Sequence, residues 1–100
     1  TATEISPARI MNETASFFGV TVDDLLGNSR TKQLATARQI AMYLCRELTE
    51  LSLPRIGEEF GGKDHTTVLY AERKISQLMT EDRMIFNNVT DITNRLRQVR

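Results

Sequence analysis

The sequence has little cysteine, histidine or proline, and it lacks both a long apolar run and an excess of charge of one sign. Its single cysteine, Cys45, cannot form a disulfide within the chain, so nothing indicates an oxidising compartment and a cytoplasmic location is expected. One histidine and one cysteine are too few for a zinc site, so no metal is expected. No apolar run approaches the length of a membrane span and no signal peptide opens the sequence, so a membrane span is not expected.

The charges balance, with 13 Lys and Arg against 13 Asp and Glu, whereas many DNA-binding domains are plainly basic. This balance slightly favours a protein-interaction module over a nucleic-acid binder. A basic surface can still form if folding turns Glu47, Glu50, Glu58 and Glu59 away from it. A chain of 100 residues is large enough for one modest core, so a single domain over 1–100 is expected.

The spacing of apolar residues predicts helices throughout. Only two prolines occur, Pro7 and Pro54, and each stands where a helix is expected to begin. Nearly every segment has apolar residues at three- and four-residue steps, which places them on one helix face. The predicted fold is therefore all-α, with about six helices that include a helix-turn-helix at approximately 53–79 and flanking helices within 6–26, 32–50 and 81–99.

Capping residues indicate where these helices begin. Ser6 is expected to cap the first helix. Thr21, with Asp24 three residues later, resembles a capping box that opens a short second helix. Thr80 is expected to start the last helix, since the acidic residues after it suit the positive end of a helix. The apolar stripe of that last helix is Ile85, Val89, Ile92, Leu96 and Val99.

The segment 52–68 is the most informative part of the chain, because it predicts a short helix, a turn and the start of a second helix. Ile56 and Phe60 lie four residues apart, so both are expected to face the core. Gly61 and Gly62 lack a Cβ and can adopt the positive φ of a sharp turn. This is the layout of a helix-turn-helix, which places the first turn of its second helix in the DNA major groove.

The polar residues at the start of the second helix have the chemistry to read base edges. Ammonium, carboxylate, imidazole and hydroxyl groups occur together in the run Lys63, Asp64, His65, Thr66 and Thr67. Two simpler interpretations stay open at this point. The run is a solvated helix start, or the carboxylate of Asp64 only caps helix amides, which contributes about 1 kcal/mol.

One match to a known pattern is a coincidence. Gly57 to Lys63 fits the first seven positions of the phosphate-binding pattern G-x-x-x-x-G-K-[ST]. Asp64 stands at the eighth position, where a hydroxyl must bind magnesium, and its carboxylate would repel phosphate. A phosphate-binding loop also follows a buried strand, whereas this segment follows the start of a helix. A phosphate-transfer enzyme is therefore a weak alternative.

The residues of the turn are more specific than its layout. The run Ile56-Gly57-x-x-Phe60-Gly61-Gly62-Lys63-Asp64-His65-Thr66-Thr67-Val68, followed by Ala71 and Lys74-Ile75, closely resembles the signature of the C-terminal DNA-binding domain of DnaA, the bacterial chromosomal replication initiator. The resemblance extends to Phe18-Gly19-Val20 with Asp24-Leu25, and to Arg38-Gln39-x-Ala41-Met42-Tyr43-Leu44. It covers essentially the whole chain.

The resemblance implies sequence-specific binding of double-stranded DNA at DnaA boxes, the short repeats of the replication origin. It implies major-groove base contacts from Lys63, Asp64, His65, Thr66 and Thr67. It also implies that Arg30 enters the adjacent minor groove, where a narrow A·T-rich groove attracts a guanidinium. Phosphate contacts are implied for Arg38, Gln39, Arg46, Ser52, Leu53 and Pro54.

The resemblance further implies that this chain has no catalytic activity and no cofactor, because ATP binding and oligomerisation belong to an upstream module of DnaA proteins. The isolated domain is then expected to be a monomer associated with the nucleoid, with regulatory proteins as further partners. The alternative is a helical protein–protein interaction module that does not bind DNA.

Overall fold

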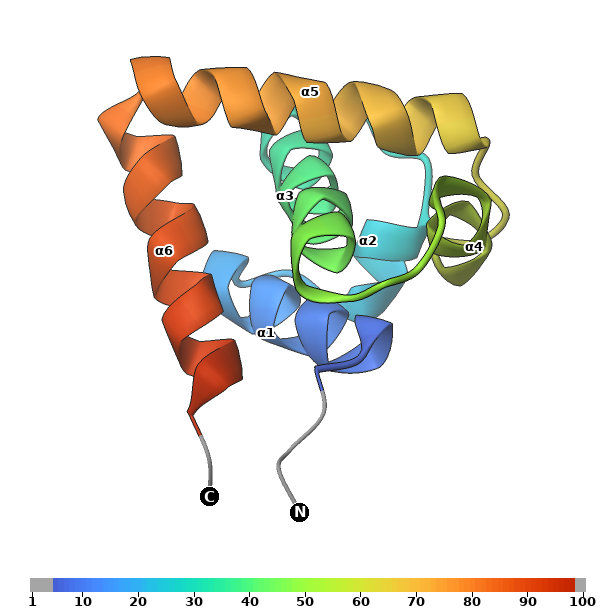
Figure 1. Ribbon diagram of the computed structural model, residues 1–100, viewed down its shortest axis with the longest axis horizontal. Helices are drawn as coiled ribbons and strands as arrows, with labels where there is room; N and C mark the ends of the chain where they lie inside the picture. Colours follow the sequence, from blue (N-terminus) through green and yellow to red (C-terminus); the bar gives the residue numbers. More distant parts are fainter. Residues whose placement is uncertain (1–4, 99–100) are drawn as a thin grey trace.

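The computed structural model describes residues 5–98, and every regular element in that part of the chain is a helix. Figure 1 shows the arrangement, with α5 along the top, α6 descending at the left, α1 at the bottom and α3 in the middle. The all-α prediction with about six helices is confirmed. The helices are α1 (Pro7–Phe18), α2 (Val22–Leu26), α3 (Lys32–Leu48), α4 (Leu53–Glu59), α5 (His65–Glu81) and α6 (Arg83–Arg97).

The first two helices begin at the predicted caps. The Ser6 side chain accepts a hydrogen bond from the backbone N–H of Arg9. Backbone N–H groups in the first turn of a helix have no carbonyl partner within the helix, so this bond stabilises the helix start. Thr21 and Asp24 form the expected capping box, in which each side chain accepts from the other residue's backbone N–H at 3.0 and 3.1 Å. These local hydrogen bonds fix where α1 and α2 start.

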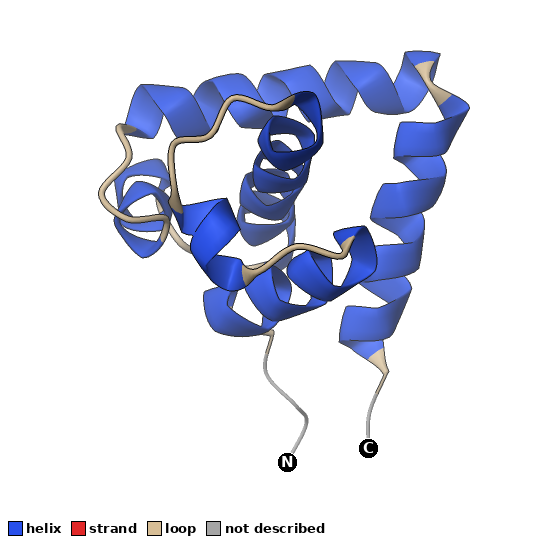
Figure 2. Cartoon of the chain, turned by 180° about the vertical axis from the view of Figure 1, so that it is seen from behind, coloured by secondary structure: helices blue, strands red, loops and turns tan. Residues whose placement is uncertain are grey.

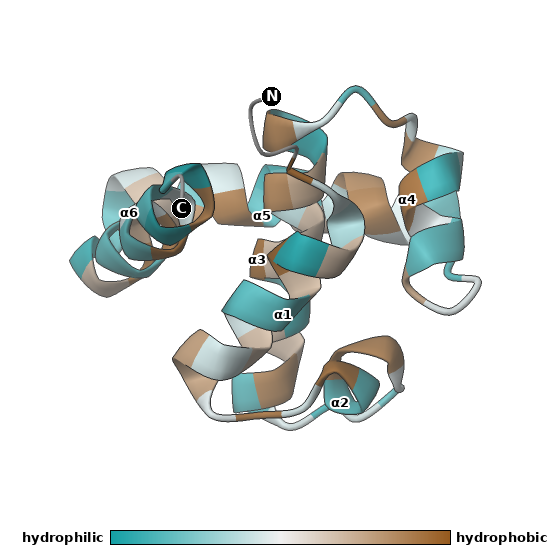
Figure 3. Cartoon of the chain, turned by 90° about the horizontal axis from the view of Figure 1, so that it is seen from below, coloured by the Kyte–Doolittle hydropathy of each residue, from teal (hydrophilic) through white to brown (hydrophobic). Residues whose placement is uncertain are grey.

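The core lies around α3, which packs against α1 on one side and α5 on the other. On α3, apolar residues at three- and four-residue steps (Ala37, Ile40, Ala41 and Leu44) are buried, and the expected core residues Ile56 and Phe60 are buried as well. In Figure 3 the hydrophilic residues of α4 lie on the side away from the rest of the molecule. The fully buried side chains include Ile10, Leu25, Ala37, Ile40, Ala41, Ile56, Phe60, Val68 and Ile75.

The boundary between the last two helices differs from the prediction. Thr80 does not start the last helix; it lies inside α5, where its hydroxyl donates to the carbonyl of Gln77. Asp82 is the N-cap instead, because its carboxylate accepts from the backbone N–H of Met84 at 2.9 Å. Threonine and aspartate are both capping residues, and the carboxylate at Asp82 takes the role. Of the predicted α6 stripe, Val99 lies outside the described residues.

Two arrangements matter for the candidate site. Helix α4 lies under the N-terminal end of α5, so the two helices form the predicted helix-turn-helix at one corner of the molecule (Figure 1). Seen from behind, the loop that joins α2 to α3 climbs toward α5 (Figure 2). In the described part of the chain, no helix combines the length and the apolar character needed to cross a membrane.

Candidate nucleic-acid interface

The turn between α4 and α5 is held by the carbonyl of Gly57. This oxygen accepts from the backbone N–H groups of Gly62 at 3.1 Å and Lys63 at 2.8 Å. Gly61 and Gly62 have φ of +83° and +84°, the left-handed conformation expected for them. A Cβ on Gly57 would overlap the Lys63 carbonyl, so the turn packs directly on the α4 backbone. The same hydrogen bonds occupy two amides that a phosphate-binding loop would need, which disfavours that alternative at this loop.

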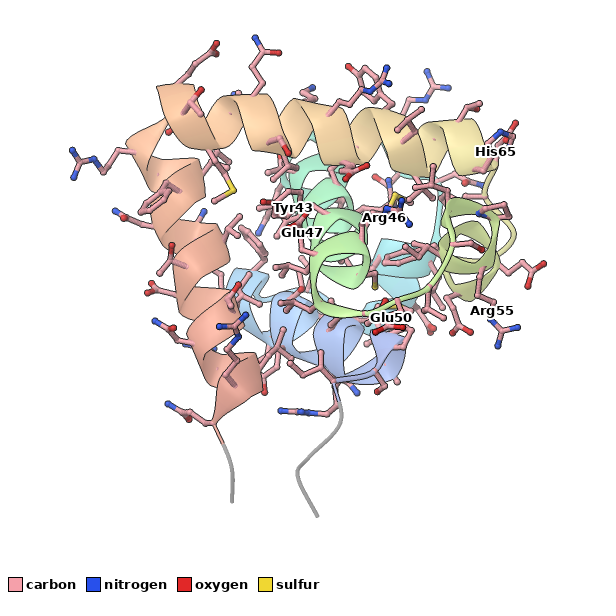
Figure 4. All side chains as sticks on the ribbon, viewed as in Figure 1. Tyr43, Arg46, Glu47, Glu50, Arg55 and His65 are labelled. Carbon is pink, nitrogen blue, oxygen red and sulfur yellow. The ribbon has the colours of Figure 1, made fainter. Side chains whose placement is uncertain are left out.

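The first turn of α5 projects from the molecule. Asp64 is its N-cap, and one carboxylate oxygen accepts from the backbone N–H of Thr66 at 3.2 Å. The same oxygen lies 3.0 Å from Nδ1 of His65, whose side chain is 57% exposed. Thr66 and Thr67 are also exposed. In Figure 4, His65 lies at the outer end of α5. The polar run is therefore accessible, and Asp64 caps the helix while remaining at the surface.

A hollow of about 340 Å³ lies beside this turn, between the loop after α2, the first half of α3 and α5. Its lining includes three cationic residues and no carboxylate residue. The hollow therefore brings together site residues that are far apart in the sequence. The predicted site residues that line the hollow are Arg30, Arg38, Gln39, Lys63 and Thr67.

Arg30 is exposed on the loop between α2 and α3, at the edge of this hollow. The next residue, Thr31, is the N-cap of α3, and its backbone N–H lies 3.4 Å from the hydroxyl of Ser29. Both neighbours of Arg30 therefore take part in local contacts, and Arg30 stands at the position for which the resemblance implies a minor-groove contact.

The guanidinium of Arg38 has an internal set of partners that the sequence did not predict. Its Nε donates to the Leu25 carbonyl at 2.8 Å, and its two terminal nitrogens donate to the carbonyls of Asp24 and Ser29 at 2.9 and 3.0 Å. The residue is only 9% exposed. Burial lowers the pKa of Arg38 below its ordinary value. A phosphate contact by this side chain stays a prediction, since three of its N–H groups already bond to the protein.

Lys63 is likewise engaged inside the protein. Its ammonium donates to the Leu26 carbonyl at 3.0 Å and to the Phe60 carbonyl at 3.1 Å. Desolvation, and next the charge of nearby Arg38, lower the pKa of Lys63. The base contact expected of Lys63 also stays a prediction, because its ammonium already donates to two protein carbonyls.

The residues predicted to contact phosphates around α4 lie at the start of that helix. Ser52 is its N-cap and accepts from the backbone N–H of Arg55 at 3.3 Å. Leu53 and Pro54 form the first turn. Arg46, on α3, donates to the carbonyl of Leu51, so its guanidinium lies next to the same chain segment. These residues form a second cluster, separate from those lining the hollow.

None of the four acidic residues that a basic surface has to exclude lines the hollow: Glu47, Glu50, Glu58 and Glu59. Glu58 and Glu59 lie on α4, within 3.8 and 3.4 Å of the Arg55 guanidinium. Glu50 and His65 are well separated in Figure 4, with Glu50 at the lower side of the molecule. The balanced composition therefore does not produce a balanced surface, because the hollow has cations without neighbouring carboxylates among its lining residues.

Two residues near the site were not singled out from the sequence. Tyr70 is 59% exposed and lines the hollow, and the ammonium of Lys74 lies 5.8 Å from its ring centroid. The signal was present, because Tyr70 follows Thr67 by three residues and so shares its helix face. Within the described residues, no group of three or more His, Cys, Asp or Glu is placed to hold a metal ion.

Comparisons with known proteins agree with this geometry. The family model described as the bacterial dnaA protein helix-turn-helix matches residues 7–75. The chromosomal replication initiator protein DnaA of Cutibacterium acnes is 66% identical over 96 residues, and that of Leifsonia xyli is 63% identical over 94 residues. These matches cover 96% and 94% of this chain but only 19% and 20% of the relatives, so the chain spans about a fifth of their length.

A solved structure described as a DNA replication initiation factor has the same fold. It aligns with a TM-score of 0.72 and 30% sequence identity, over 90% of this chain and 30% of the other. The matched family region contains the α4–turn–α5 unit up to residue 75, including the exposed first turn of α5. On the family match and on relatives that share well over half of its residues, this chain belongs to the bacterial DnaA family, as its helix-turn-helix domain.

Proposed function

We propose that this domain binds double-stranded DNA sequence-specifically at DnaA boxes and so serves the initiation of chromosomal replication. The observation that carries the proposal is the first turn of α5, which is exposed, polar and next to a hollow lined by cations without carboxylates. The relatives are named as replication initiators, which agrees with this assignment.

The major-groove contacts follow from the position of the polar run at a helix N-terminus. The backbone amides there carry partial positive charge, which attracts a phosphate and draws the helix end into the groove. His65, Thr66 and Thr67 then present an imidazole and two hydroxyls to base edges, and threonine methyl groups can pack on thymine methyls. Asp64 caps the helix through one oxygen and accepts from a cytosine amino group with the other.

Arg30 supplies the minor-groove contact. It lies on the loop between α2 and α3, which lines the hollow together with α5, so the two reading elements belong to different parts of the same surface. A guanidinium is favoured in a narrow A·T-rich minor groove, where the negative potential is concentrated. The pair of contacts would fix both the register and the direction of the domain on an asymmetric site.

Phosphate contacts complete the proposed interface. Gln39 lines the hollow between the two reading elements, and Arg46, Ser52, Leu53 and Pro54 form the cluster at the start of α4. Contacts of this kind position the protein without reading sequence. We propose a different role for Arg38 and Lys63 below, because their N–H groups bond to protein carbonyls.

The remaining expectations concern the longer protein. We infer that the domain is a monomer in the cytoplasm, associated with the nucleoid, and that it performs no catalysis. ATP binding and oligomerisation would belong to an upstream module, and regulatory proteins would be further partners. This chain matches about a fifth of its relatives' length, so the relatives are long enough to contain such a module.

The test is a binding titration of this chain with a DnaA-box duplex and a scrambled duplex of the same composition, each at several salt concentrations. The proposal predicts tighter binding to the DnaA-box duplex and a log–log salt slope near −0.9 for each phosphate contact. Equal affinity for both duplexes would reduce the function to non-specific DNA binding. No binding to either would favour the protein-interaction module.

A further inference from the structure

The loop that carries Arg30 has to be held in place if its guanidinium is to enter a groove at low cost. The loop has five residues, Gly27 to Thr31, and no regular structure. A side chain on a mobile loop loses conformational freedom when it binds, and that loss weakens the affinity. A fixed loop avoids this loss, so the contacts that fix it determine how well Arg30 can act.

The Arg38 side chain bonds both to the helix that precedes this loop and to the loop itself. Two of its hydrogen bonds reach Asp24 and Leu25, at the end of α2, and the third reaches Ser29, directly before Arg30. The last carbonyls of a helix have no partner within the helix, so a buried guanidinium is a suitable donor for them. Arg38 therefore ties the end of α2 to the middle of the Arg30 loop.

Lys63 joins the same loop to the helix-turn-helix. It immediately precedes the N-cap of α5, and its ammonium bonds to the carbonyl of Leu26, the last residue of α2, and to that of Phe60, the C-cap of α4. The Leu26 carbonyl also lies against the turn, since a Cβ on Gly61 would approach it to 3.1 Å. The end of α2 and the turn are thus in direct contact, with Lys63 bridging them.

The two cations stay close together although their charges repel. Burial, and next the charge of Arg38, lower the pKa of Lys63. Like charges gather in a partly buried place only where other groups compensate them. In this place the carbonyls of five residues accept hydrogen bonds from the two cations: Asp24, Leu25, Leu26, Ser29 and Phe60.

We propose that Arg38 and Lys63 are positioning residues, which hold the Arg30 loop and the first turn of α5 in one fixed relation so that both reading elements meet the duplex together. The proposal rests on the proposed function, because it concerns how two parts of the same interface are coupled. It replaces the direct contacts with a base and a phosphate that the resemblance implied for Lys63 and Arg38.

A double-mutant cycle on Lys63 and Arg30 tests the proposal. The affinity for a DnaA-box duplex and its salt slope are measured for the unsubstituted protein, Lys63→Met, Arg30→Ala and the double variant. Positioning predicts that Lys63→Met weakens binding roughly tenfold when Arg30 is present and much less when Arg30 is already absent. The slope of the double variant should equal that of Arg30→Ala alone.

A direct contact of the Lys63 ammonium with the DNA gives the opposite result. Lys63→Met would then reduce the magnitude of the slope by up to about 0.9 in both backgrounds, and the two substitutions would be additive. That outcome overturns the proposal. Lys63→Gln sharpens the distinction, because its amide can still donate to the Leu26 carbonyl without a charge. Positioning predicts that Lys63→Gln restores most of the affinity that Lys63→Met loses, whereas a direct contact predicts an equal loss of slope for both.

Controls separate this question from folding and from the proposed function. Lys74→Met removes a cation from the exposed face of α5 and should be additive with Arg30→Ala, because Lys74 contacts Tyr70 and not the loop. Amide exchange should rise at Gly27 to Thr31 in Lys63→Met while the core stays protected.

If the Lys63→Met variant does not fold, Lys63→Gln takes its place in the double-mutant cycle. If the unsubstituted protein does not prefer the DnaA-box duplex, the proposed function fails; if it does and the cycle is additive, only the positioning role fails.

Discussion

His65 is the residue on which the proposed readout depends most directly. It is the only histidine in the chain, and it stands at the first position of α5 with its ring exposed and Nδ1 next to the Asp64 carboxylate. That contact orients the ring, so Nε2 points away from the cap. Orientation of this kind is needed at a helix start, where the side chain otherwise rotates freely in solvent.

We expect His65→Ala to lower the discrimination between a DnaA-box duplex and a scrambled duplex by roughly 1–3 kcal/mol, because a base contact is lost. The melting temperature should change little, since the side chain is exposed. Arg83→Ala is the matched control, because Arg83 is also exposed and also stands first in its helix. Equal discrimination by His65→Ala and the unsubstituted protein would remove His65 from the interface.

Cys45 is expected to make the stability of the folded protein depend on pH. Its thiol is fully buried on α3, and desolvation by burial, with a smaller contribution from Glu59, raises its pKa from 9.0 to about 12. In the unfolded chain the thiol ionises near its ordinary pKa, whereas in the folded chain it keeps its proton. Above about pH 9 the unfolded state therefore binds fewer protons than the folded state, and the free energy of unfolding falls as pH rises.

The expected loss at pH 10 is on the order of 1 kcal/mol from this thiol alone. Urea unfolding at pH 8 and pH 10 measures it, with Cys45→Ala as the comparison. The alanine variant should be less stable at both values but should lose less stability between them. Identical losses would mean that the thiol does not titrate differently in the two states. Tyr43, whose pKa burial also raises, contributes equally to both proteins.

At the scale of elements, the helix-turn-helix depends on how closely α4 approaches the turn. Gly57 has no room for a Cβ because the Lys63 carbonyl occupies that space, whereas Gly62 has open space around it. The constraint on Gly62 is conformational only, since its φ is positive. The two glycines therefore have different reasons for lacking a side chain, and substitutions can separate them.

We expect Gly57→Ala to destabilise the fold by roughly 3 kcal/mol, at the upper end of the range for overpacking, because backbone and not a flexible side chain has to move. Gly62→Ala should cost about 1–2 kcal/mol, the strain of a left-handed conformation at a residue with a Cβ. Thermal unfolding of both variants measures the difference. A larger loss from Gly62→Ala than from Gly57→Ala would contradict the close approach.

The elements themselves could be predicted from the sequence because their signals are local. Ser6, Thr21 and Asp64 bond to amides within three residues, and apolar spacing identifies the buried face of α3. The prediction at Thr80 is wrong because two capping residues stand close together and the structure uses Asp82. The partners of Arg38 and Lys63 could not be predicted, since they are carbonyls up to 37 residues away with no sequence signal of their own.

At the scale of the whole molecule, folding separates charges that are balanced along the chain. The net charge is zero, yet the hollow beside α5 is lined by Arg30, Arg38 and Lys63 without a carboxylate residue. Glu58 and Glu59 pair with Arg55 on α4 instead. A local positive potential attracts a polyanion even when the total charge is zero, because screening in salt leaves only nearby charges effective.

In the proposed complex, the first turn of α5 and the Arg30 loop both face the duplex. Amide chemical-shift mapping of this chain by NMR, on addition of a DnaA-box duplex, tests it most directly. We expect the largest changes at Asp64 to Thr67 and at Gly27 to Thr31, with smaller ones at Ser52 to Pro54 and little change along α6. Changes concentrated on α6 or α1, with the first turn of α5 unaffected, would contradict it.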